Sequence, residues 1–217
     1  MGMNRQFSNY DKMKDEMSEV FLRYDQHSMI QKFALEHDEN NLYLLFLNRK
    51  YRVNRFTGRV TWSKDSFQTV EDADYNEVMT IYDVLCYSKE NCCLAHEWVN
   101  TGSLSTVQGG TLVKGGDFFH RSGEYFSGKA DLLARACEVL VGRKAEGGDL
   151  AYELDLFPFL PIILRFWDAD EDFPASLQVF VDQNILDYMH YETLMFAIGH
   201  LLNRLKEEMR SGVCGGI

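Results

Sequence analysis

The sequence lacks a long apolar run. Its longest, residues 156–164, is interrupted by Pro158 and Pro161 and is far shorter than the roughly 20 residues that a bilayer span needs. We therefore expect no membrane-spanning segment. The start, residues 1–11, has no apolar core followed by a small-residue cleavage site, so no secretory signal is visible. We expect a cytoplasmic protein.

Cysteine is sparse, and its spacing excludes one class of protein. The count of 5 is odd, and no C-x-x-C pair occurs, which argues against a secreted disulfide framework. We expect reduced thiols. The cysteines are Cys86, Cys92, Cys93, Cys137 and Cys214.

Familiar catalytic motifs are missing as well. The H-E-x-x-H, G-x-S-x-G and G-x-G-x-x-G patterns are absent, which argues against a zinc protease, a serine hydrolase and a dinucleotide enzyme. Residues 123–129 match the spacing of a phosphate loop, but Ala130 replaces the Ser or Thr that should hold magnesium, and we interpret the match as coincidence. No pattern indicates a cofactor or an oligomeric state.

The composition is that of a folded domain. Hydrophobic residues make up 46% of the 217 residues, including 15 Phe and 11 Tyr, which excludes a disordered chain. A chain of this length buries roughly 70 to 75 per cent of its unfolded surface. No linker, repeat or low-complexity segment divides it. We expect a single domain over residues 1–217.

Apolar periodicity predicts four helices and two groups of strands. Asp74 and Glu77 form a capping-box pattern at the start of the second helix. The predicted helices cover residues 8–24, 74–88, 129–141 (ending before Gly142) and 184–210. The predicted strands cover residues 42–47, 51–55 and 59–62, and then residues 152–156, 162–167 and 177–181. Residues 100–128 are rich in Gly, Ser and Thr and predict loops with a short hairpin.

These elements predict an α+β fold. An antiparallel sheet, made of an N-terminal meander and a C-terminal hairpin, is expected to pack with amphipathic helices. The last helix is apolar on every side between Leu194 and Ile198, so we expect it to be buried.

The order of motifs in the C-terminal half carries a resemblance. Its parts are residues 156–158 with Pro161, residues 167–176, residues 180–182, a Tyr188 … Glu192 pair, and a strand pair near the start at residues 43–51. The chain thereby resembles an uncharacterised prokaryotic family, the domain of unknown function 3786, over most of its length. That family is common in anaerobes, and the resemblance implies one shared domain but no reaction. Some relatives are joined to an iron–sulfur-type cysteine motif, whose spacing is absent here, and no catalytic residue carries over.

Charge is unevenly distributed. The net charge is −11, yet residues 49–59 hold five cations and no acid, which leaves −16 for the rest of the chain. The cations are Arg49, Lys50, Arg52, Arg55 and Arg59. They predict docking of an anionic ligand or an acidic protein, or else an exposed face neutralised by the protein's own acids. The acidic remainder argues against nucleic acid as the partner.

Two groups of residues have ligand types that metals accept. Asp168, Asp170 and Asp172 occupy alternate positions of a calcium-loop pattern, but Phe173 replaces the turn glycine, so the EF-hand interpretation fails. A weaker divalent-cation site and a solvated hairpin tip both stay open. Zinc or an iron–sulfur cluster is a second hypothesis, although adjacent cysteines point apart and Cys86 fits an apolar helix face. The residues of that hypothesis are Cys86, Cys92, Cys93 and His96.

Arg165 and Glu192 are charged residues within apolar patterns. A buried ion pair would satisfy both. The alternative is an enzyme in which Glu192, or a carboxylate of the acidic tip, performs chemistry while Arg165 orients an anionic substrate. We expect a non-catalytic binding or accessory domain first, and this enzyme second.

Overall fold

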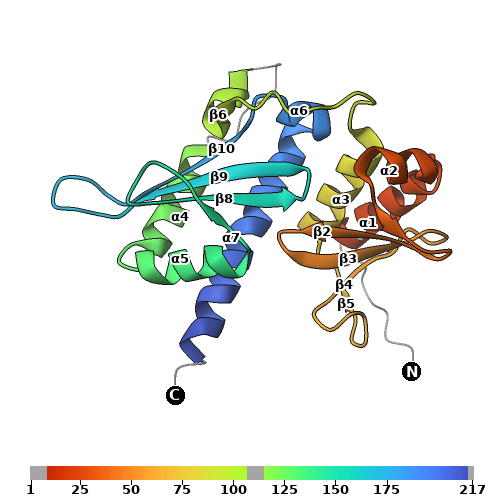
Figure 1. Cartoon of the computed structure of the whole chain (residues 1–217), viewed down its shortest axis with the longest axis horizontal. Coiled ribbons are helices and arrows are strands. Elements are labelled where there is room, and N and C mark those ends of the chain that lie inside the picture. Colours follow the sequence, from red (N-terminus) through yellow and green to blue (C-terminus); the bar gives the residue numbers. More distant parts are fainter. Residues whose placement is uncertain (1–8, 107–114, 215–217) are drawn as a thin grey trace. The chain divides into compact units, whose positions relative to one another are not determined.

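The computed structural model describes residues 9–106 and 115–214. The chain forms two compact units, each assembled from segments distant in the sequence (Figure 1). Unit 1 comprises Met1–Cys92 and Leu186–Ile198, and unit 2 comprises Cys93–Ile185 and Gly199–Ile217. Both units combine helices with an antiparallel sheet, so the predicted α+β class is confirmed. The meander and the C-terminal hairpin were expected in one sheet, but they belong to two separate sheets. The single domain over residues 1–217 stays a prediction.

Unit 1 is built on a five-stranded antiparallel sheet in the order β1-β2-β3-β4-β5. Its strands are β1 (Glu36–His37), β2 (Asn41–Phe46), β3 (Arg49–Asn54), β4 (Val60–Ser63) and β5 (Glu71–Asp72). Its helices are α1 (Asn9–Phe21), α2 (Gln26–Phe33) and α3 (Tyr75–Tyr87), with most of α6 (Ile185–Tyr188) and the first part of α7 (Tyr191–Cys214). Figure 1 shows α1, α2 and α3 gathered on one side of the sheet.

The predicted meander is confirmed in β2, β3 and β4, and its residues alternate between two faces. Leu42, Leu44 and Phe46 of β2 are buried, as are Tyr51 and Val53 of β3. Since successive side chains of a strand point to opposite faces, the residues between them lie on the outer face.

The first hairpin turn lies one residue earlier than predicted. Leu47 and Asn48 form it, with φ angles of 49° and 55°. Two successive positive φ angles are typical of the tight turn that matches strand twist.

Unit 2 holds a second five-stranded antiparallel sheet, in the order β6-β10-β9-β8-β7. Its strands are β6 (Trp98–Asn100), β7 (Arg143–Lys144), β8 (Leu150–Phe157), β9 (Leu160–Trp167) and β10 (Ser176–Asp182). Its helices are α4 (Gly115–Phe126), α5 (Ala130–Val139) and the rest of α7, with a 3-10 turn at Thr101–Thr106. Helix α4 packs on β10 and α5 on β8. Among the described residues, no helix is long and apolar enough to cross a membrane.

The prediction of loops over residues 100–128 is wrong for the part that forms α4. Residues 107–114 lie outside the described residues. Gly123 of this helix allows close packing, because a Cβ there would lie 2.7 Å from the carbonyl oxygen of Ala175. Glycine in this helix therefore serves the approach of α4 to β10.

The predicted closing helix is interrupted. It divides into α6 and α7, and the break occurs at Met189–His190. Asp83 of α3 accepts hydrogen bonds from the backbone N–H of His190 (2.7 Å) and lies 2.7 Å from its ring Nδ1. The buried Asp83 carboxylate thus binds an N–H group that has no acceptor within the helix, and a new helix, α7, starts at this point. Helix α2, which periodicity did not predict, has a similar cap: the Asp25 side chain accepts a hydrogen bond from the His27 N–H.

The end of α5 also differs from the prediction. The helix was expected to continue to residue 141, but it ends at Val139, and Val141 adopts the left-handed conformation, with φ 61°. Gly142 is needed for space, because a Cβ there would lie 2.8 Å from the Cys137 carbonyl oxygen. Val141 is 62% exposed and is a β-branched residue in a strained region of backbone conformation.

Val141→Gly should therefore stabilise the protein by about 1 kcal/mol, because glycine adopts this conformation without steric strain. Gly142→Ala should destabilise it, because the new methyl group meets backbone. Urea unfolding of the two variants and the wild type measures both effects. A loss of stability in Val141→Gly would contradict the account of this helix end.

Asp83→Ala should destabilise unit 1 by about 3 kcal/mol, since two hydrogen bonds to a buried carboxylate are lost. The matched control is Asp187→Ala, which removes the surface ion pair with Lys89 (2.6 Å) and should have a much smaller effect. Chemical unfolding followed by far-UV circular dichroism compares the two. Equal losses would show that Asp83 has no special role at the start of α7.

Candidate functional site

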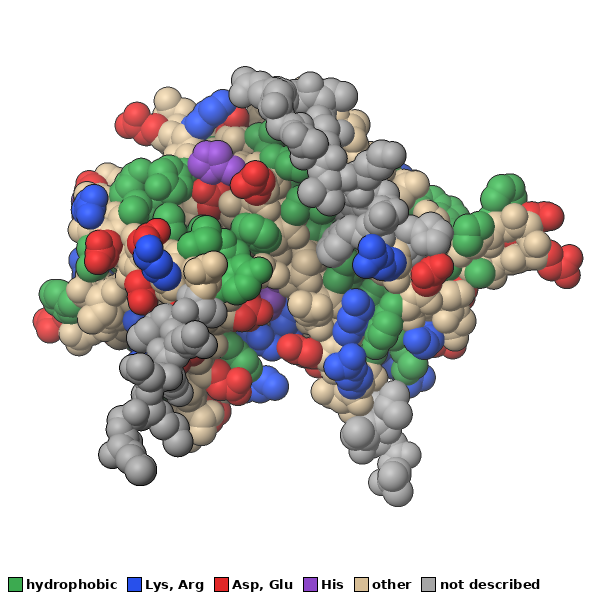
Figure 2. Space-filling model, turned by 180° about the vertical axis from the view of Figure 1, so that it is seen from behind, with side chains coloured by type: hydrophobic (Ala, Val, Ile, Leu, Met, Phe, Trp, Pro, Cys, Tyr) green, Lys and Arg blue, Asp and Glu red, His purple; other side chains and the backbone are tan. Residues whose placement is uncertain are grey.

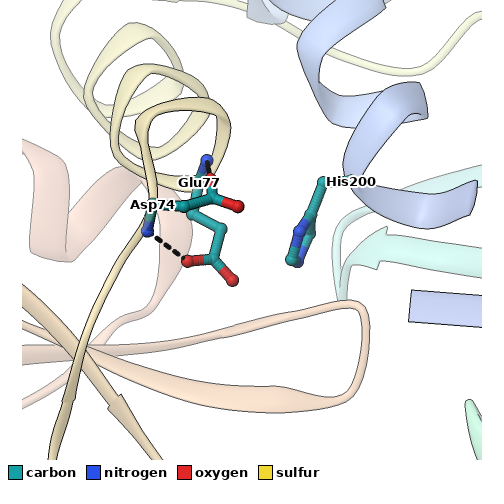
Figure 3. Close-up of side chains that lie close together, drawn as sticks. All are labelled: Asp74, Glu77 and His200. Carbon is teal, nitrogen blue, oxygen red and sulfur yellow. Dashed lines mark hydrogen bonds between the residues drawn. The ribbon is translucent and has the colours of Figure 1, made fainter. Parts of the chain in front are cut away.

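Glu77 organises the start of α3. The predicted capping box is present: the Asp74 side chain accepts from Glu77 N–H (2.9 Å), and Glu77 Oε2 accepts from Asp74 N–H (2.6 Å). Figure 3 shows the two side chains at this helix end, with the second bond dashed. The cap thus uses only one of the two oxygens of Glu77.

The other oxygen of Glu77 binds the sheet. Tyr51 Oη donates to Glu77 Oε1 at 2.6 Å, and Arg49 Nη1 lies 3.1 Å from the same atom. The Arg49 and Glu77 side chains are only 6% and 3% exposed. Burial raises the pKa of Glu77 and also that of Tyr51, next to the Glu77 charge. The guanidinium of Arg49 stacks on Trp62 at 3.8 Å from the ring centroid. Arg49 therefore pairs with Glu77 inside the protein and does not lie on the surface with the other cations.

Lys50 and Arg52 lie on the opposite face of β3 from Arg49, as expected from the alternation of the strand. Lys50 Nζ pairs with Glu36 at 2.7 Å, across the sheet. Arg52 lies between Tyr43 of β2 and Thr61 of β4 in the strand register. The outer face of the sheet therefore carries a cation at its centre.

Arg52 is held in place without a carboxylate. Its Nε donates to Thr61 Oγ1 at 3.1 Å, and its guanidinium lies 4.7 Å from the centroid of the Phe67 ring. Within the described residues, Arg52 makes no ion pair with an acid. Arginine presents a planar fork of five donors, and the bond to Thr61 uses only the Nε–H of Arg52.

Arg55 and Arg59 flank the turn between β3 and β4. Arg55 donates to the side chain of Gln26 (3.0 Å) and to the carbonyl of Asp38 (2.9 Å). Arg59 pairs with Asp72 at 2.6 Å, and both side chains are largely exposed. Of the five cations, then, three belong to ion pairs and Arg55 is bound to neutral groups.

A hollow of about 440 Å³ opens over Arg52 and Arg59. Its remaining lining residues are Asn41, Asn54, Thr57, Thr61 and Val70, so none of the described residues that line it is acidic. Figure 2 shows basic and acidic side chains interspersed over the visible face, without a broad basic surface. This local hollow, with its neutral hydrogen-bonding groups, is therefore the candidate anion site that we consider in unit 1.

The acidic tip uses its carboxylates to shape turns. Asp168 accepts from Gly128 N–H (2.9 Å) and Ser127 Oγ (2.9 Å), and the Gly128 bond is the main cause that lowers the pKa of Asp168. Asp170 accepts from the N–H groups of Asp172 and Phe173. In the described part of unit 2, these three aspartates do not bring three ligand atoms within 4.8 Å of one another.

The cysteine and histidine candidates have different environments. Cys86 is on the buried face of α3, and burial raises the pKa of its thiol to about 12, so the thiol is protonated at neutral pH. Cys92 is half-buried, whereas Cys93 and His96 are exposed. The backbone N–H of His96 donates to Asp182 at 2.8 Å. Cys86 and Cys92 belong to unit 1, and Cys93 and His96 to unit 2.

Arg165 and Glu192 belong to different units. Glu192 lies in the first turn of α7 and is exposed, so it needs no buried cation. Arg165 is half-buried, and its guanidinium lies 4.4 Å from the centroid of the Phe180 ring. The buried Nε of Arg165 has no hydrogen-bond partner among the described residues.

One basic cluster was missed by the sequence reasoning. In unit 2, Lys129 Nζ and Lys206 Nζ lie 4.4 Å and 4.8 Å from the centroid of the same ring, that of Tyr125. The residues come from the turn after α4 and from α7, so no local spacing pattern relates them. Only the packing of the two helices could have revealed this cluster.

The sequence model of one protein family, described as Domain of unknown function (DUF3786), matches residues 25–204. The chain belongs to this family. The match confirms the resemblance and covers the whole sheet of unit 1, including Arg52 and Arg59. A search of curated proteins and a search of solved structures gave no significant match. The DUF3786 family carries no assigned reaction, so function has to be argued from the site itself.

Arg49→Met should destabilise the protein by about 3 kcal/mol at neutral pH, because it leaves the Glu77 carboxylate buried without its cation. Arg49 lowers the pKa of Glu77 and burial raises it, so the variant has a still higher Glu77 pKa when folded. Unfolded Glu77 releases its proton near the ordinary value of 4.5. The destabilisation should therefore grow as the pH rises above the ordinary carboxyl pKa, through the raised pKa of folded Glu77.

Urea unfolding at several pH values checks this prediction. Arg23→Met is the control, because Arg23 is exposed on α1 and pairs with Glu19 only at 3.8 Å. The control should follow the wild type at every pH. A pH-independent loss in Arg49→Met would contradict the role assigned to Glu77.

Proposed function

We propose that unit 1 is a non-catalytic binding module for an anionic group, carried by a small ligand or presented by an acidic protein partner. The observation that carries this proposal is the hollow over Arg52 and Arg59, where none of the described lining residues is acidic. A volume of about 440 Å³ falls within the range of small-molecule sites.

Arg52 is the principal binding residue in this proposal. The bond to Thr61 and the stacking on Phe67 fix its guanidinium before a ligand arrives. A preorganised fork loses less conformational entropy on binding, and its geometry fits carboxylate and phosphate groups. Asn41, Asn54 and Thr57 supply neutral hydrogen-bonding groups around the same hollow.

The remaining charge favours a compact anion over a long one. The −16 charge outside residues 49–59 would repel an extended phosphate backbone, so nucleic acid is not part of the proposal.

The odd cysteine count favours a reducing compartment, and we propose a cytoplasmic location. The resemblance to a family common in anaerobes favours an accessory role in anaerobic metabolism.

The alternative is an enzyme that uses Glu192 or the acidic tip together with Arg165. Fewer observations favour these residues as a site than favour the hollow over Arg52 and Arg59. The carboxylates of Asp168 and Asp170 already accept backbone hydrogen bonds, and Glu192 is exposed at the start of a helix. The binding module is therefore the function that we favour.

Arg52→Gln should weaken the binding of inorganic phosphate by about tenfold, because a charge-assisted, bidentate contact is lost. The matched control is Arg23→Gln, which removes the same charge from an exposed position on α1 and should leave binding unchanged. Calorimetric titration at low ionic strength measures both, since salt screens an exposed site. Wild-type affinity in Arg52→Gln, or no phosphate binding by the wild type, would contradict the proposal.

A further inference from the structure

Unit 2 brings two lysines to the ring of one tyrosine. Lys129 Nζ lies 4.4 Å from the centroid of the Tyr125 ring, and Lys206 Nζ lies 4.8 Å from it. Tyr125 belongs to α4, Lys129 is the N-cap residue of α5, and Lys206 belongs to α7. Three separate elements therefore place two ammonium groups at one half-buried ring.

The contacts of these lysines leave their positive charges unbalanced. Lys129 Nζ donates to the backbone carbonyl oxygen of Tyr125 at 2.6 Å, and this acceptor is neutral. Within the described residues, neither lysine pairs with a carboxylate. A cation–π contact stabilises an ammonium group without neutralising it. Two like charges therefore repel each other at the Tyr125 ring.

The acids that follow Lys206 in α7 pair with another cation. Glu207 and Glu208 both accept from Arg204 Nη1, at 2.9 Å and 2.7 Å. Arg204 is only 6% exposed, so these two acids balance a buried charge. The carboxylates that are closest to Lys206 along the chain are therefore already in use.

Two further cations lie on the same faces of these helices. Arg121 precedes Tyr125 by four residues in α4, and Arg210 follows Lys206 by four residues in α7. Residues with this spacing are neighbours on one side of a helix. Both arginines are exposed, and neither has an ion pair in the part of the chain that the structure describes. The surroundings of the Tyr125 ring therefore carry local positive charge, although the net charge of the chain is −11.

We propose that Lys129 and Lys206 bind a phosphate group between them, while the Tyr125 ring holds the two side chains in position. A phosphate monoester carries a charge of about −1.5 to −2 at neutral pH, which balances both lysines, whereas a carboxylate balances only one. Each ammonium group has three donors, and Lys129 uses one of them on the Tyr125 carbonyl. The remaining donors suit the acceptor oxygens of phosphate. This site lies in unit 2 and is independent of the hollow over Arg52 and Arg59.

NMR titration of the full chain, followed at the amide signal of Lys129, tests this site. The probes are inorganic phosphate, methyl phosphate and acetate, added at low ionic strength because salt screens exposed charges. We expect both phosphates to bind at least about fivefold more tightly than acetate, because they carry the larger charge. The tighter of the two tells whether the ligand is free phosphate or a phosphate ester. Phosphate binding no tighter than acetate, or an unmoved Lys129 signal, would overturn the inference.

Lys206→Gln should weaken phosphate binding at this site by about tenfold, because a charge-assisted hydrogen bond is lost. The matched control is Lys144→Gln, which removes the same charge from an exposed lysine of unit 2 that has no cation–π contact among the described residues. The control should leave the affinity unchanged. Equal losses in the two variants would show only a general attraction between the anion and positive charge, and would overturn the inference.

Two substitutions of Tyr125 test the role of its ring. Tyr125→Phe should keep the affinity for phosphate, because the phenyl ring still holds both ammonium groups, whereas Tyr125→Leu should lower it severalfold. Equal affinities of these two variants would contradict the positioning role. Arg52→Gln should leave the titration at Lys129 unchanged, so the result here stands or falls separately from phosphate binding in unit 1.

Discussion

Unit 1 depends on the interactions that the carboxylate of Glu77 makes. One oxygen closes the capping box of α3, and the other receives Tyr51 and pairs with Arg49. A single buried side chain thereby joins a helix start to the middle strand of the sheet. Burying this carboxylate is unfavourable by itself and raises its pKa, and the contacts with Tyr51, Asp74 N–H and Arg49 offset that cost.

This constraint also determines which cation can bind a ligand. With Arg49 and Tyr51 turned toward Glu77, the period of β3 turns Lys50 and Arg52 toward the outer face. A shift of one residue in register would exchange the two sets. The buried ion pair and the exposed hollow are therefore two consequences of one strand register.

Much of the fold could be predicted from local patterns. The alternation of β2 and β3 and the Asp74–Glu77 box gave the meander and the start of α3, because these signals lie within a few residues of one another. The break before α7 was not predictable, since it depends on Asp83, far away in the sequence. Helix α4 was missed because the Gly, Ser and Thr content of residues 100–128 is typical of loops, whereas Gly123 serves close helix–strand packing. In the site, the basic run and the alternation of its strand were visible in the sequence, but the pairing of Arg49 with Glu77, 28 residues away, was not.

The central claim is that Arg49 is an internal partner of Glu77 while Arg52 receives an external anion. Side-chain NMR of the arginine Nε–Hε groups, recorded while inorganic phosphate is added, tests both halves at once. The account predicts that the Arg52 signal shifts with phosphate, whereas the Arg49 signal stays in place and exchanges slowly with solvent. A phosphate-dependent shift or fast exchange at Arg49, with a silent Arg52, would contradict it.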